Sequence, residues 1–371
     1  MPYKHPIKQI LIATRSAWDC PEFRPAARQN FDKVTKCGTL ALGAEIYTSE
    51  NEEKLVPHTC KVRPCPSCGH RATLQWQRER WCALPDIPYV GIVLSMPDVL
   101  WPIFQKNRHL LHGLPKLGAA VIQQWTKLKY GVRVSIMVVP HTFGGRLNFN
   151  SHLHILVSAG GLYESEGRWV DNLIFDEHKD KLMHMWRFAV ITYLRAALDA
   201  KVLACHLSPT TLSTCLKQQY ERWWSIDVDA FASKEHFLRY AGRYVRRPPI
   251  AAYRFVKITD REVRFWYKNK ILKRRVNISC TPEEFVATLA EHVPDRYQHG
   301  IRYFGLLAPR SNARTYAAVF ALLRQQKRPC PRRLGWAFLL KRDFGKDPTI
   351  DCLGQPMRWA GRLKPRIQVA D

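Results

Sequence analysis

Two histidines separated by one leucine, His152 and His154, are the residues that first point to chemistry. They lie in a short apolar run with asparagines before it and glycines after it, which is typical of a strand with a turn at each end. Because successive side chains of a strand point to opposite faces, both imidazoles share one face, and Leu153 and Ile155 share the other. The pair therefore predicts two nitrogen ligands for a metal ion. A metallo-hydrolase strand of the His-x-His-x-Asp type fits less well, because Leu156 stands where the carboxylate belongs.

Such a pair is a weak signal alone, because short motifs also occur on strands that bind nothing. The candidate nucleophiles that strengthen it follow Ser233, a suitable N-cap, and precede Pro248, so that about 15 residues between the two can be helical. His236, Tyr240 and Tyr244 recur every four residues, which aligns them on one face of that helix. The alternative is that both tyrosines are packing residues with their hydroxyls at the surface.

The surroundings of the tyrosines are basic and predict phosphate binding. The flanking arginines are Arg239, Arg243, Arg246 and Arg247. A tyrosine hydroxyl has a pKa of about 10 and is a weak nucleophile unless its target is prepared. A divalent ion, Mg²⁺ or Mn²⁺, held by His152 and His154 can act as a Lewis acid on a scissile phosphate. Attack leaves a phosphotyrosine bond and a free hydroxyl on the departing DNA end, and two tyrosines permit two such links, as strand transfer requires.

Three cysteines near the N-terminus predict a zinc site. Cys65 and Cys68 form a Cys-x-x-Cys-Gly knuckle, whose turn brings two thiolates to one ion, and Cys60 supplies a third. The sequence offers three candidates for the fourth ligand, of which we favour the first: Cys37, His58 and His70. The lysines, arginines and tryptophans around these cysteines suit a small DNA-binding module, and a solvated helix face is the alternative.

The composition of the chain limits the classes of protein that it can be. Its 371 residues are 46% hydrophobic, which is enough for two or three globular domains. Lys and Arg number 58 against 31 Asp and Glu, so the formal net charge is +27 and nucleic acid is the expected partner. The sequence has no export signal and no apolar run of about 18 residues, which predicts a cytoplasmic protein without a membrane partner. In that compartment, its eleven cysteines are expected to be thiols or metal ligands.

The histidine strand and the tyrosine helix need a scaffold, and the remaining pattern predicts an α+β fold. Apolar, β-branched runs predict a mostly antiparallel central sheet with strands at 89–96, 132–139, 146–161 and 223–228. Helical periodicity predicts helices at 101–129, with a break at 113–115, and at 176–200 and 210–221. These helices are expected to flank the sheet.

The later part of the chain predicts further elements. They are a β-meander at 253–258, 263–267 and 272–278, a helix that begins at Thr281, a strand within 297–307 and a helix at 311–327. The basic residues after Arg324 are predicted to form an irregular extension. The expected domains are a zinc-ribbon-like, DNA-binding module at 1–83, a domain with the histidine and tyrosine motifs at 84–308, and a helix with a basic extension at 309–371.

Three stretches together resemble one known family. They are Phe149-Asn-Ser-His-Leu-His-Ile-Leu-Val-Ser-Ala-Gly-Gly161, Tyr240-Ala-Gly-Arg-Tyr244 running into Arg247-Pro-Pro-Ile-Ala251, and Arg302-Tyr-Phe-Gly-Leu306. In this order and spacing, over residues 37 to 307, they resemble rolling-circle transposases of the insertion sequence 91 family, which are two-tyrosine HUH (His-hydrophobic-His) endonucleases. The resemblance implies binding of single-stranded transposon ends and target DNA, and nicking through a 5′-phosphotyrosine intermediate. It also implies an N-terminal zinc-binding domain and a sheet related to the ferredoxin-like palm.

Some positions depart from the family pattern. The family's zinc module usually carries a further Cys-x-x-Cys pair, whose places are taken here by Ser49 and Glu52. Ser151 replaces the proline of the family's Asn-Pro-His-x-His, which leaves both histidines intact. The third metal ligand of such enzymes usually comes from the tyrosine helix or nearby. We expect His236, one turn before the first tyrosine, with Glu235 as its substitute.

Two other functions remain open. A plasmid replication initiator or relaxase uses the same chemistry, but the sequence has no helicase P-loop, and the zinc module favours a transposase. A decayed copy that binds DNA without cutting it is the other alternative. The changes at Ser49 and Glu52 support decay, and the intact histidine and tyrosine pairs oppose it. The expected cofactors are Mg²⁺ or Mn²⁺ at the histidines, and Zn²⁺ at Cys37, Cys60, Cys65 and Cys68.

Overall fold

The computed structural model describes residues 5–204, 207–269, 272–310, 312–329, 335–345 and 347–365. Its centre is an antiparallel sheet in the order β11-β4-β5-β3-β7, with β6 (Arg168–Val170) paired to β5. The main strands are β3 (Tyr89–Leu94), β4 (Arg133–Phe143), β5 (Phe149–Tyr163), β7 (Ile226–Phe231) and β11 (Arg302–Gly305). The predicted α+β fold with an antiparallel centre is confirmed.

The connections of this sheet follow a split βαββαβ order. α6 joins β3 to β4, α7 lies between β5 and β7, and β5 lies between β3 and β4 in the sheet. This is the ferredoxin-like arrangement. Most residues of β4 and β5 are buried on both faces, because helices cover both sides of the sheet, and their sequences are nearly continuous apolar runs for this reason.

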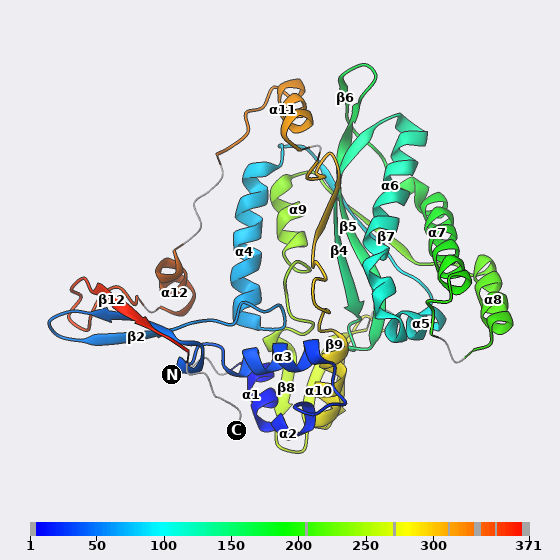
Figure 1. The fold of residues 1–371 in the computed structure, drawn as a ribbon. Coiled ribbons are helices and arrows are strands. Elements are labelled where there is room, and N and C mark those ends of the chain that lie inside the picture. The colour runs from blue at the N-terminus through cyan, green and yellow to red at the C-terminus, as the bar shows by residue number, and fades with distance from the viewer. Residues whose placement is uncertain are drawn as a thin grey trace.

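Four helices cover one face of the sheet: α5 (Trp101–Lys106), α6 (Leu114–Tyr130), α7 (Lys179–Asp199) and α8 (Pro209–Gln218). Leu153 and Ile155 of β5 pack there with Trp125 of α6 and Trp186 of α7. A break between two helices is present as predicted but lies earlier than 113–115, since a 3₁₀ segment at Arg108–His112 separates α5 from α6, which begins at Leu114. Figure 1 shows α6 and α7 together on this side of the sheet.

The opposite face carries α4 (Pro66–Ala83), α9 (Lys234–Ala241) and α11 (Asn312–Leu322). Met137, Val139 and Leu156 of the sheet pack there against Trp76 of α4 and Phe237 of α9. In Figure 1, α4 and α9 stand side by side across the sheet from α6 and α7. Sequence alternation therefore divided the residues of β5 correctly between its two faces.

A second hydrophobic core lies beside the sheet. It is enclosed by α1 (Pro6–Ala13), α2 (Arg15–Trp18), α3 (Pro25–Thr35), α10 (Pro282–Glu291) and a meander of β8 (Phe255–Ile258), β9 (Val263–Lys268) and β10 (Arg275–Cys280). Trp18, Phe31, Phe265 and Phe285 fill this core. The predicted meander is confirmed, and so is the helix start at Thr281, which forms a capping box.

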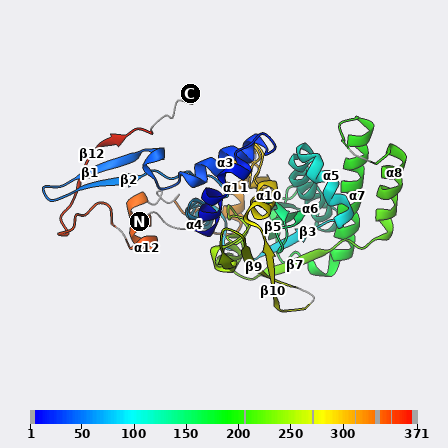
Figure 2. The ribbon, with the colours of Figure 1, turned by 90° about the horizontal axis from the view of Figure 1, so that it is seen from below.

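A third sheet joins distant parts of the chain. β12 (Arg358–Leu363) pairs with β1 (Ala44–Thr48), which pairs with β2 (Glu53–Pro57). The prediction of an irregular extension after Arg324 is therefore wrong, because this part of the chain contains β12 and also α12 (Trp336–Phe344). The local pattern could not show this, because Arg362 bonds a residue 317 positions earlier, Glu45. Figures 1 and 2 both show this sheet projecting from the helical body.

Smaller differences concern the ends of elements. The strand expected at 223–228 is β7, and the strand expected within 297–307 is the short β11. The division of the chain at residues 83 and 308 stays a prediction. Among the residues that the structure describes, no helix is both long enough and apolar enough to cross a bilayer.

Candidate active site and metal centres

Three histidines, which we name the histidine cluster, gather on the face of the central sheet that α9 covers. His152 and His154 come from β5, and His141 comes from β4, where it lies directly opposite His152. Residues paired in this way place their Cβ atoms about 4.5–5.5 Å apart, so a third imidazole joins the predicted pair. One nitrogen of each ring lies within 4.8 Å of the others.

Backbone carbonyls determine which nitrogen carries the hydrogen in two of these rings. His152 donates from Nδ1 to the carbonyl oxygen of Asn150 at 2.9 Å, and His141 donates from Nε2 to that of Tyr244 at 3.0 Å. Because a carbonyl oxygen only accepts, the lone pairs of the neutral rings are on Nε2 of His152 and Nδ1 of His141. Metal-bound histidines are commonly held by such second bonds.

The electrostatics of the cluster also suit a metal. Burial, followed by the neighbouring His154 and His152, lowers the pKa of His141 well below its ordinary value, which keeps the ring neutral. Two nitrogens bound to one ion at about 2.1 Å lie about 3.0–3.4 Å apart, depending on the coordination geometry. The Nε2 atoms of His152 and His154 are 3.2 Å apart. The three residues that would hold an ion are therefore His141, His152 and His154.

His236 and Glu235, expected from the sequence as the third ligand, lie elsewhere. Both are exposed on α9, and Glu235 pairs with Arg239 at 2.6 Å. Tyr244 is the residue that touches the cluster, and His236 is not part of the group of candidate ligands there. The expectation of His236 as a ligand therefore does not fit the structure, which places His141 beside the pair instead.

Both tyrosines belong to this site, but their surroundings differ. The ring of Tyr244 stacks on that of His154, with centroids 3.8 Å apart and planes at 24°. The ring of Tyr240 lies 5.0 Å from that of Tyr244. Tyr240 is 6% exposed, whereas Tyr244 is only half-buried. Burial is the main cause that raises the pKa of Tyr240 above its ordinary value.

The helix that carries the tyrosines is shorter than predicted. α9 ends at Ala241, and Tyr244 follows in a turn in which its N–H bonds the carbonyl oxygen of Ala241 at 3.0 Å. Arg246 has a φ of +53°, a left-handed conformation that ends helical geometry. The buried stripe expected from the spacing is nevertheless present, since Phe237, Ala241 and Val245 are all 0% exposed.

Of the four arginines predicted to bind DNA, two face the site. Arg243 and Arg247 line a large cleft beside the histidine cluster, and the guanidinium of Arg243 lies 4.9 Å from the ring centre of Tyr240. Arg239 is exposed and paired with a glutamate of its own helix, and Arg246 is exposed in the turn. The arginines therefore fall into a pair inside the cleft and a pair outside it.

The cleft has a volume of about 3450 Å³ and opens on the histidine cluster. On one side it reaches the sheet of β1, β2 and β12, from which Trp359 and Arg362 line it. On the other side it reaches the meander and the 3₁₀ segment just before it, from which Lys268 and Tyr253, respectively, line it. A groove with basic and aromatic walls suits a strand of nucleic acid, whose phosphates are charged and whose bases stack.

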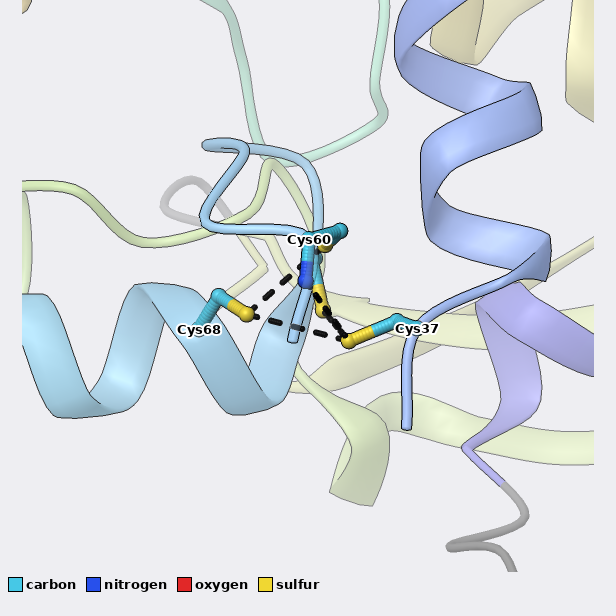
Figure 3. A group of neighbouring side chains, drawn as sticks. Cys37, Cys60 and Cys68 are labelled. Carbon is cyan, nitrogen blue, oxygen red and sulfur yellow. Dashed lines mark hydrogen bonds between the residues drawn. The ribbon is translucent and has the colours of Figure 1, made fainter. Parts of the chain in front are cut away.

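The second metal centre lies where α4 begins. The Sγ atom of Cys37 is 3.8 Å from that of Cys68 and 3.7 Å from that of Cys65, and the Sγ atoms of Cys60 and Cys68 are 3.7 Å apart. In Figure 3, Cys37, Cys60 and Cys68 converge. Four sulfurs around one zinc ion at about 2.3 Å lie about 3.8 Å apart in a tetrahedron. The four cysteines therefore fit Zn²⁺.

The alternatives for the fourth zinc ligand are not part of this group. His58 contacts Glu45 through Nε2 at 2.9 Å and the carbonyl oxygen of Leu42 through Nδ1 at 3.1 Å. His70 lies outside the group of four cysteines. The backbone N–H of Lys61 donates to Sγ of Cys68 at 3.2 Å, a bond that stabilises the thiolate form of that sulfur.

The two positions that replace the family's further cysteines contact the C-terminal segment. Ser49 donates from Oγ to a carboxylate oxygen of Asp351 at 2.9 Å, and Glu52 accepts from the backbone N–H of Cys352 at 2.9 Å. These bonds fasten the β1–β2 hairpin to the segment that leads into β12. Within the described ranges, only the four cysteines and the histidine cluster form groups of three or more candidate metal ligands.

α4 connects the zinc centre to the tyrosines, a contact that sequence reasoning missed. The hydroxyl of Thr73 bonds the carbonyl oxygen of Val245 at 2.6 Å, and Gln77 donates to a carbonyl of α9 at 2.8 Å. At Gly69 the two segments approach so closely that a Cβ atom would lie 2.5 Å from the carbonyl oxygen of Arg246. The helix that begins at the zinc ligands therefore packs along the segment that carries both phenols.

Comparisons with known proteins agree with this architecture. Residues 11–96 match a family model described as "Transposase zinc-binding domain", and residues 135–314 match one described as "Putative transposase". The transposase for insertion sequence element IS801 of Pseudomonas savastanoi pv. phaseolicola is 32% identical over 330 residues, which are 85% of this chain and 78% of that protein. A protein of Sinorhizobium fredii named "Putative transposase y4qJ" is 26% identical over 307 residues, which are 77% of this chain and 75% of that protein. No solved structure matches the chain.

The fold and the matches define a transposase with an N-terminal zinc-binding domain, for which DNA is the partner. Within that class, the chain belongs to the insertion sequence 91 family. The predicted membership of this family is thereby confirmed.

Proposed function

We propose that the protein nicks and rejoins single-stranded DNA at transposon ends through a 5′-phosphotyrosine intermediate, in transposition of the rolling-circle type. The observation that carries this proposal is the stacking of Tyr244 on His154, at 3.8 Å, inside the histidine cluster. A phenol beside three neutral imidazoles has both a nucleophile and a place for a Lewis acid within reach of one phosphate. The transposons' ends and the target DNA are the proposed substrates.

The residues proposed to hold the catalytic ion are His141, His152 and His154. When bound, a divalent ion withdraws charge from the phosphate oxygens and makes the phosphorus more open to attack. Mg²⁺ or Mn²⁺ can serve, and the all-nitrogen ligand set favours Mn²⁺, because Mg²⁺ prefers oxygen ligands. The chain's own contribution is the placement of the rings by the pairing of β4 with β5.

The arginines inside the cleft are proposed to hold the DNA backbone. Arg243 and Arg247 line the cleft beside the tyrosines, where guanidinium groups can bind phosphate oxygens in a bidentate manner. The aromatic residues along its walls offer surfaces for unpaired bases. These features favour a single strand over a duplex, whose bases are already stacked on one another.

The test is a covalent adduct. Labelled single-stranded oligonucleotides that contain the ends of the element are incubated with the protein and Mn²⁺ or Mg²⁺, and the products are run on a denaturing protein gel. We expect a protein–DNA band that disappears with EDTA and in the double variant Tyr240→Phe, Tyr244→Phe. Binding without any adduct, with both ions and many end sequences, would contradict the proposal and leave a DNA-binding protein that no longer cuts.

A further inference from the structure

The two tyrosines are not equivalent in this structure. Tyr244 is the one that touches the histidine cluster: its ring stacks on His154 at 3.8 Å, and its carbonyl oxygen accepts the hydrogen of His141 at 3.0 Å. Its side chain is half-buried at the cleft. A phosphate that reaches the cluster therefore meets Tyr244 first.

Tyr240 lies further from the histidine cluster than Tyr244 does. Its ring lies 4.8 Å from that of Phe231 and directly against the backbone of Gly91, where a Cβ atom would be only 3.0 Å from Cε1 of the tyrosine. A side chain at this position of β3 would press on the ring, which would have to shift by a few tenths of an ångström. The guanidinium of Arg243 covers the ring from the cleft side at 4.9 Å. Packing on several sides therefore fixes the Tyr240 ring where it lines the cleft.

A carboxylate lies on the same face of the sheet as Tyr240. Asp229 of β7 pairs with Gly91 of β3, the residue beneath the Tyr240 ring, and lines the same cleft. Side chains of directly paired residues project to the same face, so the Asp229 carboxylate lies on the face that Tyr240 covers, and burial, Tyr244 and this carboxylate raise the pKa of that phenol. β3 lies between β7 and β5, so Asp229 stands about 9.6 Å across the sheet from the histidine strand. Asp229 is therefore placed to act on Tyr240 and not on the cluster.

We propose, on the basis of the proposed function, that Tyr244 makes the first cut and that Asp229 holds Tyr240 for the second. In the first step the Oη–phosphorus bond of Tyr244 forms, the bond from phosphorus to the 3′ oxygen breaks, the phenolic proton passes to water, and the 3′ oxygen takes up a proton from water. In the second step Tyr240 does the same on another strand. Asp229 is a positioning residue, because it acts through Tyr240.

The test is a single-turnover reaction followed by peptide mapping of the adduct by mass spectrometry. With one oligonucleotide, we expect the DNA on Tyr244 in the wild-type protein and in Tyr240→Phe, and no adduct in Tyr244→Phe. With a second oligonucleotide added after the first cut, we expect a second adduct on Tyr240. Loss of a hydrogen bond to a charged group should slow this second step about tenfold or more in Asp229→Asn, while the first step stays within about twofold.

Controls separate positioning from general damage. Glu221→Gln removes an exposed carboxylate that follows α8 on the opposite face of the sheet, and should leave both steps unchanged. Tyr240→Phe keeps the packed ring and should abolish the second adduct, whereas Asp229→Asn should only slow its formation. First-turnover DNA on Tyr240, or an equal slowing of both steps in Asp229→Asn, would overturn the inference. A wild-type protein without any adduct would instead overturn the proposed function itself.

Discussion

At the scale of single residues, His141 is the side chain on which the histidine cluster depends. Its Nδ1 lone pair is available because Nε2 donates to a backbone carbonyl, and burial keeps the ring neutral. Among the described residues, no other side chain completes a group of three candidate ligands with His152 and His154. Variants of His141 can therefore be compared with variants of His236, the third metal ligand expected from the sequence.

We expect His141→Ala to lose Mn²⁺ affinity by about a hundredfold or more, because one of three ligands is removed. Covalent adduct formation should fall with it. Isothermal titration of Mn²⁺ into the protein, followed by the oligonucleotide assay, checks both. His236→Ala is the matched control and should bind and cut as the wild type does; a loss confined to His236→Ala would contradict the assignment.

The zinc centre gives a second prediction at this scale. Cys68→Ser should release zinc and lower the melting temperature, because binding energy at such a site is also folding energy. Atomic absorption on the purified protein measures the zinc content, and thermal unfolding measures the stability. Cys352→Ser, which changes an exposed cysteine outside the group, should keep a full equivalent of zinc. Equal zinc in both variants would argue against the four-cysteine site.

At the scale of elements, the contact of α4 with the tyrosine segment links the two metal centres. We expect Thr73→Val to lose about 1–3 kcal/mol of stability, since the carbonyl of Val245 is left without its buried partner. The zinc content should not change, but adduct formation should slow, because Tyr244 immediately precedes Val245. Denaturant unfolding, zinc analysis and the adduct assay measure the three effects.

The control for this variant lies on the same helix. Gln75 donates to Glu79 at 2.9 Å on the outer side of α4, so Gln75→Ala removes a hydrogen bond without touching the tyrosine segment. It should leave adduct formation unchanged. If Thr73→Val and Gln75→Ala had the same effect on adduct formation, the contact of α4 with the tyrosine segment would have no part in the reaction.

A buried histidine between the β4–β5 hairpin and α10 makes the fold sensitive to acid. Burial lowers the pKa of His292 to about 4, and Nε2 contacts the carbonyl oxygen of Leu147 at 2.6 Å. Because the folded pKa lies below the unfolded value of about 6.5, its contribution is complete above pH ~6.5 and is lost as the pH falls toward 4, by about 3 kcal/mol in total. His5, also lowered to about 4, adds to the same slope.

Urea unfolding at a series of pH values measures this effect. His292→Gln should flatten the fall in unfolding free energy between pH ~6.5 and 4, because a glutamine does not titrate there. His184→Gln changes an exposed histidine and should leave the fall as it is. An unchanged slope in His292→Gln would show that other groups govern the acid sensitivity.

The predictable parts of the site are those that local spacing controls. Alternation placed His152 and His154 opposite Leu153, and the Cys-x-x-Cys knuckle marked the zinc ligands at Cys65. The sequence did not predict His141 as a ligand, because its place depends on the register between β4 and β5, which includes a bulge just after His141. The sequence did contain a signal. Met137 and Val139 alternate with His141 along β4, so all three side chains lie on the face of the sheet that also carries His154.

Other features could not be read locally for a different reason. The tyrosine segment leaves the helix after Ala241 and turns through the left-handed Arg246, whose carbonyl oxygen lies against Gly69 of a distant helix. The role of Asp229 depends on β7 lying beside β3, which is a pairing between strands far apart in the sequence. In each case the decisive contact is tertiary, and neither propensity nor periodicity contains it.

At the scale of the whole molecule, the net charge of +27 makes DNA binding dependent on salt. We expect the double variant Arg243→Ala, Arg247→Ala to reduce the slope of log affinity against log salt by about one to two, since each lost phosphate contact releases fewer counterions. Fluorescence anisotropy with single-stranded DNA at several salt concentrations measures the slope. Arg239→Ala, outside the cleft, should change it less; an equal change would mean that bulk charge alone binds the strand.

The pairing of β12 with β1 imposes an order of events during synthesis. β1 and β2 leave the ribosome early, whereas Arg362, which bonds Glu45 and lines the cleft, follows 317 residues later. The histidine cluster and both tyrosines are therefore made before the last wall of the cleft. The groove therefore has all of its walls only when nearly the whole chain has been made.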